Sequence, residues 1–276
     1  MSASLQLTGL TKVFDTPSGP FIAVKDVNAG IRDGEFVAIL GHSGCGKSTV
    51  LSIIAGLERP TFGGVVVDGS EVLGPDARRA IVFQSPCLLP WLTARENVAL
   101  AAAQRAGFDP SRKSAAADRY LELVGIADAA DQWPAQLSLG TQQCVSLARA
   151  LSLEPRFLLL DEPFSQLDSM TRFALQDILL RVWEESDRTV VMVTHDVDEA
   201  LYLADRLILM TDGPAATVGD TLTVPFARPR RRAAVLADPE YHRCRRCILD
   251  FLEHHAHQSR PTVLDEVLRQ RVAVAR

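Results

Sequence analysis

Long apolar runs are missing from this sequence, and so is a secretion signal. No run approaches the roughly 18 apolar residues that a membrane-spanning helix needs, and the first residues, Met-Ser-Ala-Ser-Leu-Gln, carry neither a basic region nor an apolar core. The 5 cysteines, at positions 45, 87, 144, 244 and 247, form no disulfide framework, which favours a reducing compartment. We therefore expect a cytosolic chain.

An excess of basic charge is missing too. Lys and Arg number 29 against 34 Asp and Glu, a net charge of −5, so general nucleic-acid binding is not expected. The 47% hydrophobic and 23% charged content is that of an ordinary globular protein. A chain of 276 residues is long enough to bury a substantial core.

A glycine-rich stretch is the strongest motif in the chain. Its letters fit the phosphate-loop pattern G-x-x-x-x-G-K-[ST], and it lies between a strand-like run at 35–40 and a helix-like run at 50–55. The glycines permit a tight turn whose N–H groups point at one anion, and the dipole of the following helix adds to the attraction. Lys47 can reach terminal phosphates, and the Ser48 hydroxyl can bind Mg²⁺. We predict a nucleotide site formed by Gly41, His42, Ser43, Gly44, Cys45, Gly46, Lys47, Ser48 and Thr49.

The segments around this loop predict an α/β fold with a parallel sheet. Apolar runs at 5–14 and 21–31 predict an antiparallel β-layer at the N-terminus. Runs at 157–160 and 189–194 are apolar enough for buried parallel strands. Shorter strands are predicted at 65–69, 79–83, 206–210, 216–218 and 222–224. A helical pattern over about 90–150 predicts a helical subdomain inserted between two strands. Thr93 and Glu96 predict a capping box in it, and a further helix is predicted at 141–153. We expect one domain over 1–225, followed at 226–276 by a basic segment and tail helices at 239–255 and 261–271.

Polar side chains end three of the predicted strands. Asp161 and Glu162 follow one strand, where a phosphate-loop enzyme needs an Asp near Mg²⁺ and a group to polarise the attacking water. A helix cap or a solvated pair is the alternative. His195 ends the strand expected beside it and would lie near the γ-phosphate, although a lone His is more often structural. Gln84 ends another strand, and its amide could bind Mg²⁺ or the water.

In order and spacing these landmarks resemble the ATP-binding subunits of ABC transporters. The resemblance extends over residues of about 4 to 225 and includes Leu137–Thr141 and Ser165–Asp168. It implies an ATPase that uses Mg²⁺ and forms a head-to-tail dimer, homo- or heteromeric, around two ATP molecules. Ser138 and Gly140 would contact the γ-phosphate of the opposite site, and Asp168 would organise the dimer contact.

The resemblance also implies a role for Phe14, which matches the aromatic that stacks on adenine. An ordinary strand aromatic is the alternative. His42 is at a position where the family commonly has proline, and we expect an exposed loop residue there.

Two residues depart from the family pattern at 137–141. Leu139 replaces a glycine, and a side chain there restricts the backbone angle φ and crowds the approach to the phosphate. Thr141 replaces Gln or Met. We hypothesise that the chain works in a heterodimer in which one composite site is degenerate.

A closer resemblance lies with the nitrate, sulfonate and bicarbonate importer branch. The run Leu88-Leu-Pro-Trp-Leu-Thr93 is similar to that of nitrate and cyanate importers, and sulfonate and taurine importers share part of it. The implied partners are membrane permease subunits, contacted through exposed Leu88, Leu89 and Trp91, and indirectly a substrate-binding protein. The chain would then lie on the cytoplasmic face of the inner membrane. A soluble ABC-type ATPase and a phosphate-loop kinase are the rival interpretations.

The tail carries two ambiguous clusters. Cys244 and Cys247 precede His254, His255 and His257, but the gap is short for a zinc finger, and packing of both cysteines with Ile248 on an apolar stripe is favoured. The arginines at 228, 230, 231 and 232 predict a solvated segment or one that contacts anionic lipid.

Overall fold

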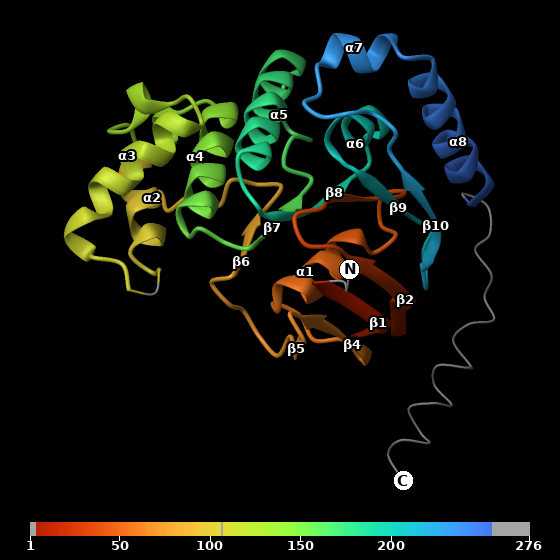
Figure 1. Cartoon of the computed structure of the whole chain (residues 1–276). Helices are drawn as coiled ribbons and strands as arrows, with labels where there is room; N and C mark the ends of the chain where they lie inside the picture. Colours follow the sequence, from red (N-terminus) through yellow and green to blue (C-terminus); the bar gives the residue numbers. More distant parts are fainter. Residues whose placement is uncertain (1–3, 106, 256–276) are drawn as a thin grey trace. The chain divides into compact units, whose positions relative to one another are not determined.

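The computed structural model describes residues 4–105 and 107–255 and divides the chain into two compact units. Unit 1 comprises Met1–Arg32, Val37–Gly74 and His195–Arg276, and unit 2 comprises Asp33–Phe36 and Pro75–Thr194. Figure 1 shows the elements of both units in the colours of the sequence. No helix of the described ranges is long and apolar enough to cross a membrane.

The predicted antiparallel β-layer is present in unit 1. Its strand order is β2-β1-β4-β5, from β1 (Leu5–Thr16), β2 (Gly19–Ile31), β4 (Phe62–Val67) and β5 (Ser70–Glu71). Strands β1 and β4 approach closely at Gly63, where a Cβ atom would lie 2.3 Å from the carbonyl oxygens of Thr8 and Gly9. Gly63 also has a φ of +71°, so both space and conformation call for glycine there.

A second group of strands, which lies in unit 1 apart from Phe36, carries the phosphate loop. Strand β3 (Phe36–Leu40) pairs in parallel with β9 (Arg206–Met210), and β9 pairs in antiparallel with β10 (Val218–Thr223). All five residues of β3 are buried, as the apolar run predicts. The two short pieces suggested by the sequence around 216–224 are one strand, β10.

Unit 2 contains the parallel strands that were predicted to be buried. Strand β7 (Phe157–Asp161) pairs in parallel with β6 (Arg79–Val82) on one side and β8 (Thr189–Thr194) on the other. Every residue of β8 is buried, and only Asp161 of β7 is partly accessible. Helix α5 (Ser169–Glu184) connects β7 to β8.

The predicted helical insert lies between β6 and β7. It contains α2 (Ala94–Ala102), α3 (Lys113–Leu123) and α4 (Leu139–Ser152), drawn from yellow to green in Figure 1. Short 3₁₀ turns connect them at Pro110–Arg112, Ala127–Ala129 and Pro134–Gln136. The capping box at the start of α2 is present, with the Glu96 amide donating to Thr93 Oγ1 at 3.2 Å and the Thr93 amide donating to Glu96 Oε2 at 2.8 Å.

Residues beyond 225 belong to unit 1. After α6 (Val197–Leu203) and β9–β10 come α7 (Arg232–Ala237), which the sequence did not predict, and α8 (Pro239–His255), which it did. The further helix predicted at 261–271 lies outside the described residues.

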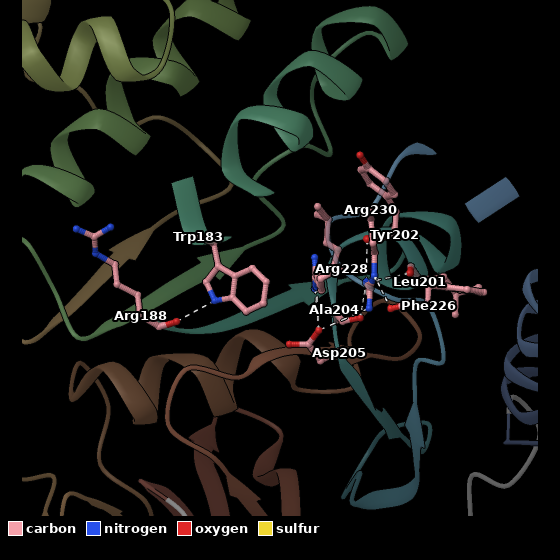
Figure 2. A network of polar contacts seen from close by, with 10 residues as sticks. Trp183, Arg188, Leu201, Tyr202, Ala204, Asp205, Phe226, Arg228 and Arg230 are labelled. Carbon is pink, nitrogen blue, oxygen red and sulfur yellow. Dashed lines mark hydrogen bonds and ion pairs between the residues drawn. The ribbon is translucent and has the colours of Figure 1, made fainter. Parts of the chain in front are cut away.

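Two arginines of the basic run, Arg228 and Arg230, are not solvated as we predicted, whereas Arg231 is exposed. The Arg230 side chain is 1% exposed, and its Nη1 donates to the carbonyls of Tyr202 at 2.9 Å and Ala204 at 2.7 Å, at the end of α6 (Figure 2). Arg228 forms an ion pair with Asp205 at 2.9 Å. Because a guanidinium at a helix C-terminus satisfies carbonyls that have no donor within the helix, these arginines hold the tail on α6.

Figure 2 also shows a similar contact within unit 2. The indole nitrogen of Trp183, near the end of α5, donates to the Arg188 carbonyl oxygen at 2.8 Å. This bond fixes the turn between α5 and β8, just before the strand that leads to His195.

Candidate nucleotide-binding site

The phosphate loop connects β3 to α1 (Lys47–Ala55) in unit 1, as predicted. Gly46 precedes the helix with a φ of +89°, and a Cβ atom there would lie 2.5 Å from Val24 Cγ1 of β2. A Cβ atom at Gly41 would lie 2.9 Å from Cys45 Sγ. The chain can therefore make this tight turn against β2 only with glycine at these positions.

Lys47 is buried at the centre of the loop. Its ammonium donates to the carbonyl oxygens of Gly41 and His42, each at 2.8 Å, and lies 3.9 Å from Cys45 Sγ. Burial raises the pKa of the Cys45 thiol above its usual value, so all three acceptors are neutral. A buried cation held by neutral dipoles attracts an anion strongly, which fits the binding of phosphate.

His42 is not the exposed loop residue that we predicted. It is half-buried, and its Nε2 lies 3.0 Å from the Leu252 carbonyl oxygen of α8. The residues of the loop that are exposed are Ser43, Gly44 and Ser48.

Phe14 and His195 are the other predicted site residues of unit 1. Phe14 is half-buried on β1, and the Lys12 ammonium lies 4.8 Å from the centroid of its ring. His195 is exposed and directly follows the last residue of β8. The prediction that its strand lies beside the Asp161 strand is confirmed by the parallel pairing of β7 and β8.

The acidic pair of unit 2 lies at the end of β7, with a sharp turn after it. Asp161 is the last strand residue, and Glu162 has a left-handed φ of +44°, which is uncommon for a residue with a side chain. The Glu162 amide donates to the Val193 carbonyl at 2.9 Å, and this bond holds the turn against β8. Strained backbone held in this way is frequent at functional sites.

Gln84 is connected to this turn through Ser165. Gln84 Nε2 donates to Ser165 Oγ at 3.1 Å, and Ser165 Oγ donates to the Glu162 carbonyl at 3.0 Å. With the amide nitrogen of Gln84 committed to Ser165, the carbonyl oxygen is the atom that a cation would use. The sequence did not assign Ser165 a role, because nothing in its spacing shows that it bridges two other site residues.

Two further side chains missed by the sequence reasoning fix the loop around Gln84. Gln143 of α4 is buried and donates from Nε2 to the Phe83 carbonyl at 3.1 Å. Arg149 of α4 donates to the carbonyls of Pro86 at 3.0 Å and Cys87 at 2.8 Å. Helix α4 therefore holds the backbone on both sides of Gln84.

The first turn of α4 carries the residues expected to face a second subunit. Ser138 caps the helix by accepting from the Thr141 amide at 3.2 Å, so α4 begins at Leu139, two residues earlier than predicted. The Thr141 hydroxyl also lies 2.9 Å from Ser138 Oγ. Leu139 is in the helix and does not have a positive φ, so its backbone angle does not require glycine. The crowding of the phosphate by its side chain stays a prediction.

Asp168 caps α5 in the same unit. Its Oδ1 accepts from the amides of Met170 at 3.0 Å and Thr171 at 3.1 Å. Hydrogen bonds from the Thr171 side chain and backbone lower the pKa of Asp168 below its usual value, because they favour the carboxylate form. Gly140 of α4 lies against α5, since a Cβ atom there would be 2.4 Å from Thr171 Cγ2.

The expected permease-facing segment is only partly exposed. Trp91 is 66% exposed, whereas Leu88 and Leu89 are half-buried. Buried Asn97 shapes this segment: its Oδ1 accepts from the Leu89 amide at 2.8 Å, and its Nδ2 donates to carbonyls of the same turn, including that of Leu92 at 3.0 Å. Trp91 is thus presented to solvent on an ordered turn.

The tail cysteines do not share one apolar stripe. Cys244 and Ile248 are buried, but Cys247 is exposed. Residues 4–105 and 107–255 contain no cluster of three or more His, Cys, Asp or Glu side chains that could hold a metal ion. His257 of the suggested cluster lies outside the described residues.

Comparison with known proteins finds relatives over most of the chain. The family model described as "ABC transporter" matches residues 24–165. The chain is 51% identical over 242 residues to the nitrate import ATP-binding protein NrtD of Synechococcus elongatus, over 87% of this chain and 88% of that protein. It is 46% identical over 252 residues to the bicarbonate transport ATP-binding protein CmpD of a Synechocystis species, over 91% and 89% respectively.

Among solved structures, the chain is similar to the dimeric post-hydrolysis state of the ATP-binding cassette MJ0796 bound to ADP and Pi. The TM-score is 0.72 with 35% sequence identity, over 81% of this chain and 100% of the cassette. The match confirms the predicted fold class: a sheet with parallel strands, an N-terminal antiparallel layer and inserted helices.

Proposed function

We propose that this chain, which belongs to the ABC transporter family as an ATP-hydrolysing subunit, powers the import of a small inorganic anion such as nitrate. The observation that carries the proposal is the 51% identity to a nitrate import subunit over most of both chains. The run from Leu88 to Thr93 supports the same branch.

Bicarbonate is the second candidate, because the chain is 46% identical to a bicarbonate transport subunit. Nitrate and bicarbonate are both small planar oxyanions of single charge. Sulfonate or taurine is the third candidate, supported only by the part of the run Leu88–Thr93 that importers of these substrates share. The permease and binding protein would select among them.

The proposed assembly is a dimer of ATP-binding subunits on the cytoplasmic face of the membrane, attached to permease subunits. The dimeric cassette with ADP and Pi supports the dimer, and exposed Trp91 supports a contact with an apolar partner surface. The first turn of α4, with Ser138 and Gly140, is the surface proposed to face the second subunit's nucleotide, and Asp168 is proposed to organise the contact.

The residues present suit ATP with Mg²⁺. Mg²⁺ prefers oxygen ligands and commonly takes one or two carboxylates together with phosphate oxygens. Ser48, Gln84 and Asp161 supply a hydroxyl, an amide and a carboxylate oxygen of that kind. When bound, the ion would neutralise phosphate charge.

Side chains of this chain would bind the nucleotide and activate the attacking water. Lys47 would bind the terminal phosphates and Glu162 would orient and deprotonate the attacking water. His195 would donate to the γ-phosphate, and Phe14 would stack on adenine. Catalysis would consist mainly of positioning and charge neutralisation.

Uptake assays test the proposal. A strain that lacks this gene is complemented with the parent chain or with Lys47→Ala, and uptake of nitrate, bicarbonate and taurine is measured. Nitrate uptake restored by the parent alone is expected. If only bicarbonate or taurine uptake is restored, that anion would replace nitrate as the proposed substrate. If the chain co-purifies with no membrane protein, a soluble ATPase would be favoured.

A further inference from the structure

The tail helix α8 has a defined position on unit 1. The Tyr241 hydroxyl donates to Asp198 Oδ1 at 2.7 Å, and Arg245 Nε donates to the same oxygen at 2.8 Å. Cys244 and Ile248 on the same helix are buried. The first half of α8 is therefore anchored on α6.

The last turn of α8 packs against β10. A Cβ atom at Gly219 of β10 would lie 2.6 Å from Phe251 Cζ, so the ring occupies the space that any other residue would need. The next residue, Leu252, carries one of the last four carbonyls of a helix that ends at His255. Such carbonyls have no amide donor within the helix and lie at the negative end of its dipole.

A donor from the phosphate loop reaches this carbonyl. His42 Nε2 lies 3.0 Å from the Leu252 oxygen, and since a carbonyl can only accept, Nε2 carries the hydrogen. The carbonyl oxygen of His42 in turn accepts from Lys47 Nζ at 2.8 Å. Two hydrogen bonds thus connect the last turn of the tail to the lysine at the centre of the loop.

We propose that His42 is a positioning residue through which α8 holds the phosphate loop in the conformation that binds nucleotide. The inference rests on the proposed function of the loop in binding ATP phosphates. A loop that is already ordered loses less conformational entropy on binding. Releasing His42 from α8 therefore weakens nucleotide binding, and it raises KM for ATP by a larger factor than it lowers kcat.

The test is a titration of the full chain with ADP and Mg²⁺, which avoids turnover. His42→Ala is expected to raise Kd by about three- to tenfold, the size of one lost hydrogen bond. His42→Gln keeps a donor of similar reach and is expected to restore most of the affinity. An unchanged or lower Kd for His42→Ala, or no rescue by His42→Gln, would overturn the inference.

A second variant tests whether the tail acts through His42. Phe251→Ala loosens the last turn and is expected to raise the Kd for ADP as His42→Ala does. The Kd of the double variant is expected to be no higher than the higher of the two single-variant values. Fully additive effects would show two independent contributions and would overturn the inference. Phe108→Ala truncates a half-buried phenylalanine of unit 2 and serves as the control with unchanged Kd.

Lys47→Ala separates this inference from the proposed function. If Lys47→Ala binds ADP as the parent does, the loop is not the phosphate site and the proposed function fails. If Lys47→Ala loses affinity while His42→Ala does not, only the role of the tail fails. Thermal unfolding of each variant establishes that the compared chains are folded.

Discussion

The side-chain nitrogen of Gln84 donates a hydrogen bond to the hydroxyl oxygen of Ser165 at 3.1 Å. The same hydroxyl donates to the Glu162 carbonyl at 3.0 Å. One serine thus sets both the orientation of the Gln84 amide and the turn that carries the proposed base.

Replacing Ser165 by Ala is expected to reduce kcat about three- to tenfold, because both hydrogen bonds are lost and the Gln84 amide can rotate. Steady-state ATP hydrolysis measures the change. Ser186→Ala is the matched control, since the Ser186 hydroxyl donates to the Trp183 carbonyl at 3.0 Å, in another part of unit 2. Equal rates of ATP hydrolysis for the two variants would show that Ser165 does not position Gln84 and Glu162 for catalysis.

Glu162→Gln is expected to leave ATP binding nearly intact and to lower turnover by about 10²- to 10⁴-fold, as for the loss of a general base. The amide cannot accept the proton of the attacking water, but it keeps the size of the side chain. Single-turnover hydrolysis and direct ATP titration measure the two effects. Glu122→Gln, on the exposed face of α3, should change neither. Hydrolysis at the parent rate would exclude Glu162 as the base.

Gly140→Ala is expected to lower the free energy of unfolding by about 1–3 kcal/mol, the usual cost of overpacking. The added Cβ would lie 2.4 Å from Thr171 Cγ2, so the Thr171 side chain or the two helices would have to shift. Thr171→Ser removes that methyl group and should restore stability in the double variant, measured by urea denaturation. A failure of this rescue would show that the glycine is not needed for packing against α5.

Stability at high pH should depend on Tyr120. Burial and a hydrogen bond to Glu154 raise the pKa of Tyr120 to about 12 in the folded chain, from an ordinary value of 10.0. Between these values the unfolded chain releases the phenolic proton and the folded chain keeps it, so rising pH favours unfolding. Tyr120→Phe removes this contribution.

Urea denaturation at a series of pH values from 9 to 12 measures the effect. The parent's free energy of unfolding should fall with pH more steeply than that of Tyr120→Phe over the upper part of the range. Identical slopes would mean that the Tyr120 hydroxyl titrates alike in both states.

Local patterns predicted most elements of the fold. Apolar runs identified the strands β1 to β4 and β6 to β9 but not the two-residue strand β5, and Thr93 with Glu96 identified the start of α2, because these signals act over a few residues. The start of α4 was misplaced, since Ser138 was assigned a phosphate role and its role as a cap was not considered. The phosphate-loop motif identified the position of the loop, and the packing of Gly46 against Val24 now explains one of its glycines.

What the sequence could not supply are contacts between distant residues. His42 and Leu252 are 210 positions apart, and neither belongs to a motif that would pair them. Arg230 lies in a run that local composition classifies as solvated, yet its partners are carbonyls at the end of α6. Likewise, the backbone angle of Leu139 follows from its position in α4 and could not be inferred from the glycine that the family has there.

The burial of Arg230 has a consequence for the stability of truncated chains. A chain cut after Pro225 would leave the carbonyls of Tyr202 and Ala204 without the donors that they have here, at 2.9 and 2.7 Å, and would uncover the part of α6 beneath α8. The cut would lose these hydrogen bonds and expose apolar surface that Cys244 and Ile248 now help to bury, so it would destabilise unit 1 itself. We therefore expect a fragment that ends at Pro225 to be less stable than one that extends to residue 255.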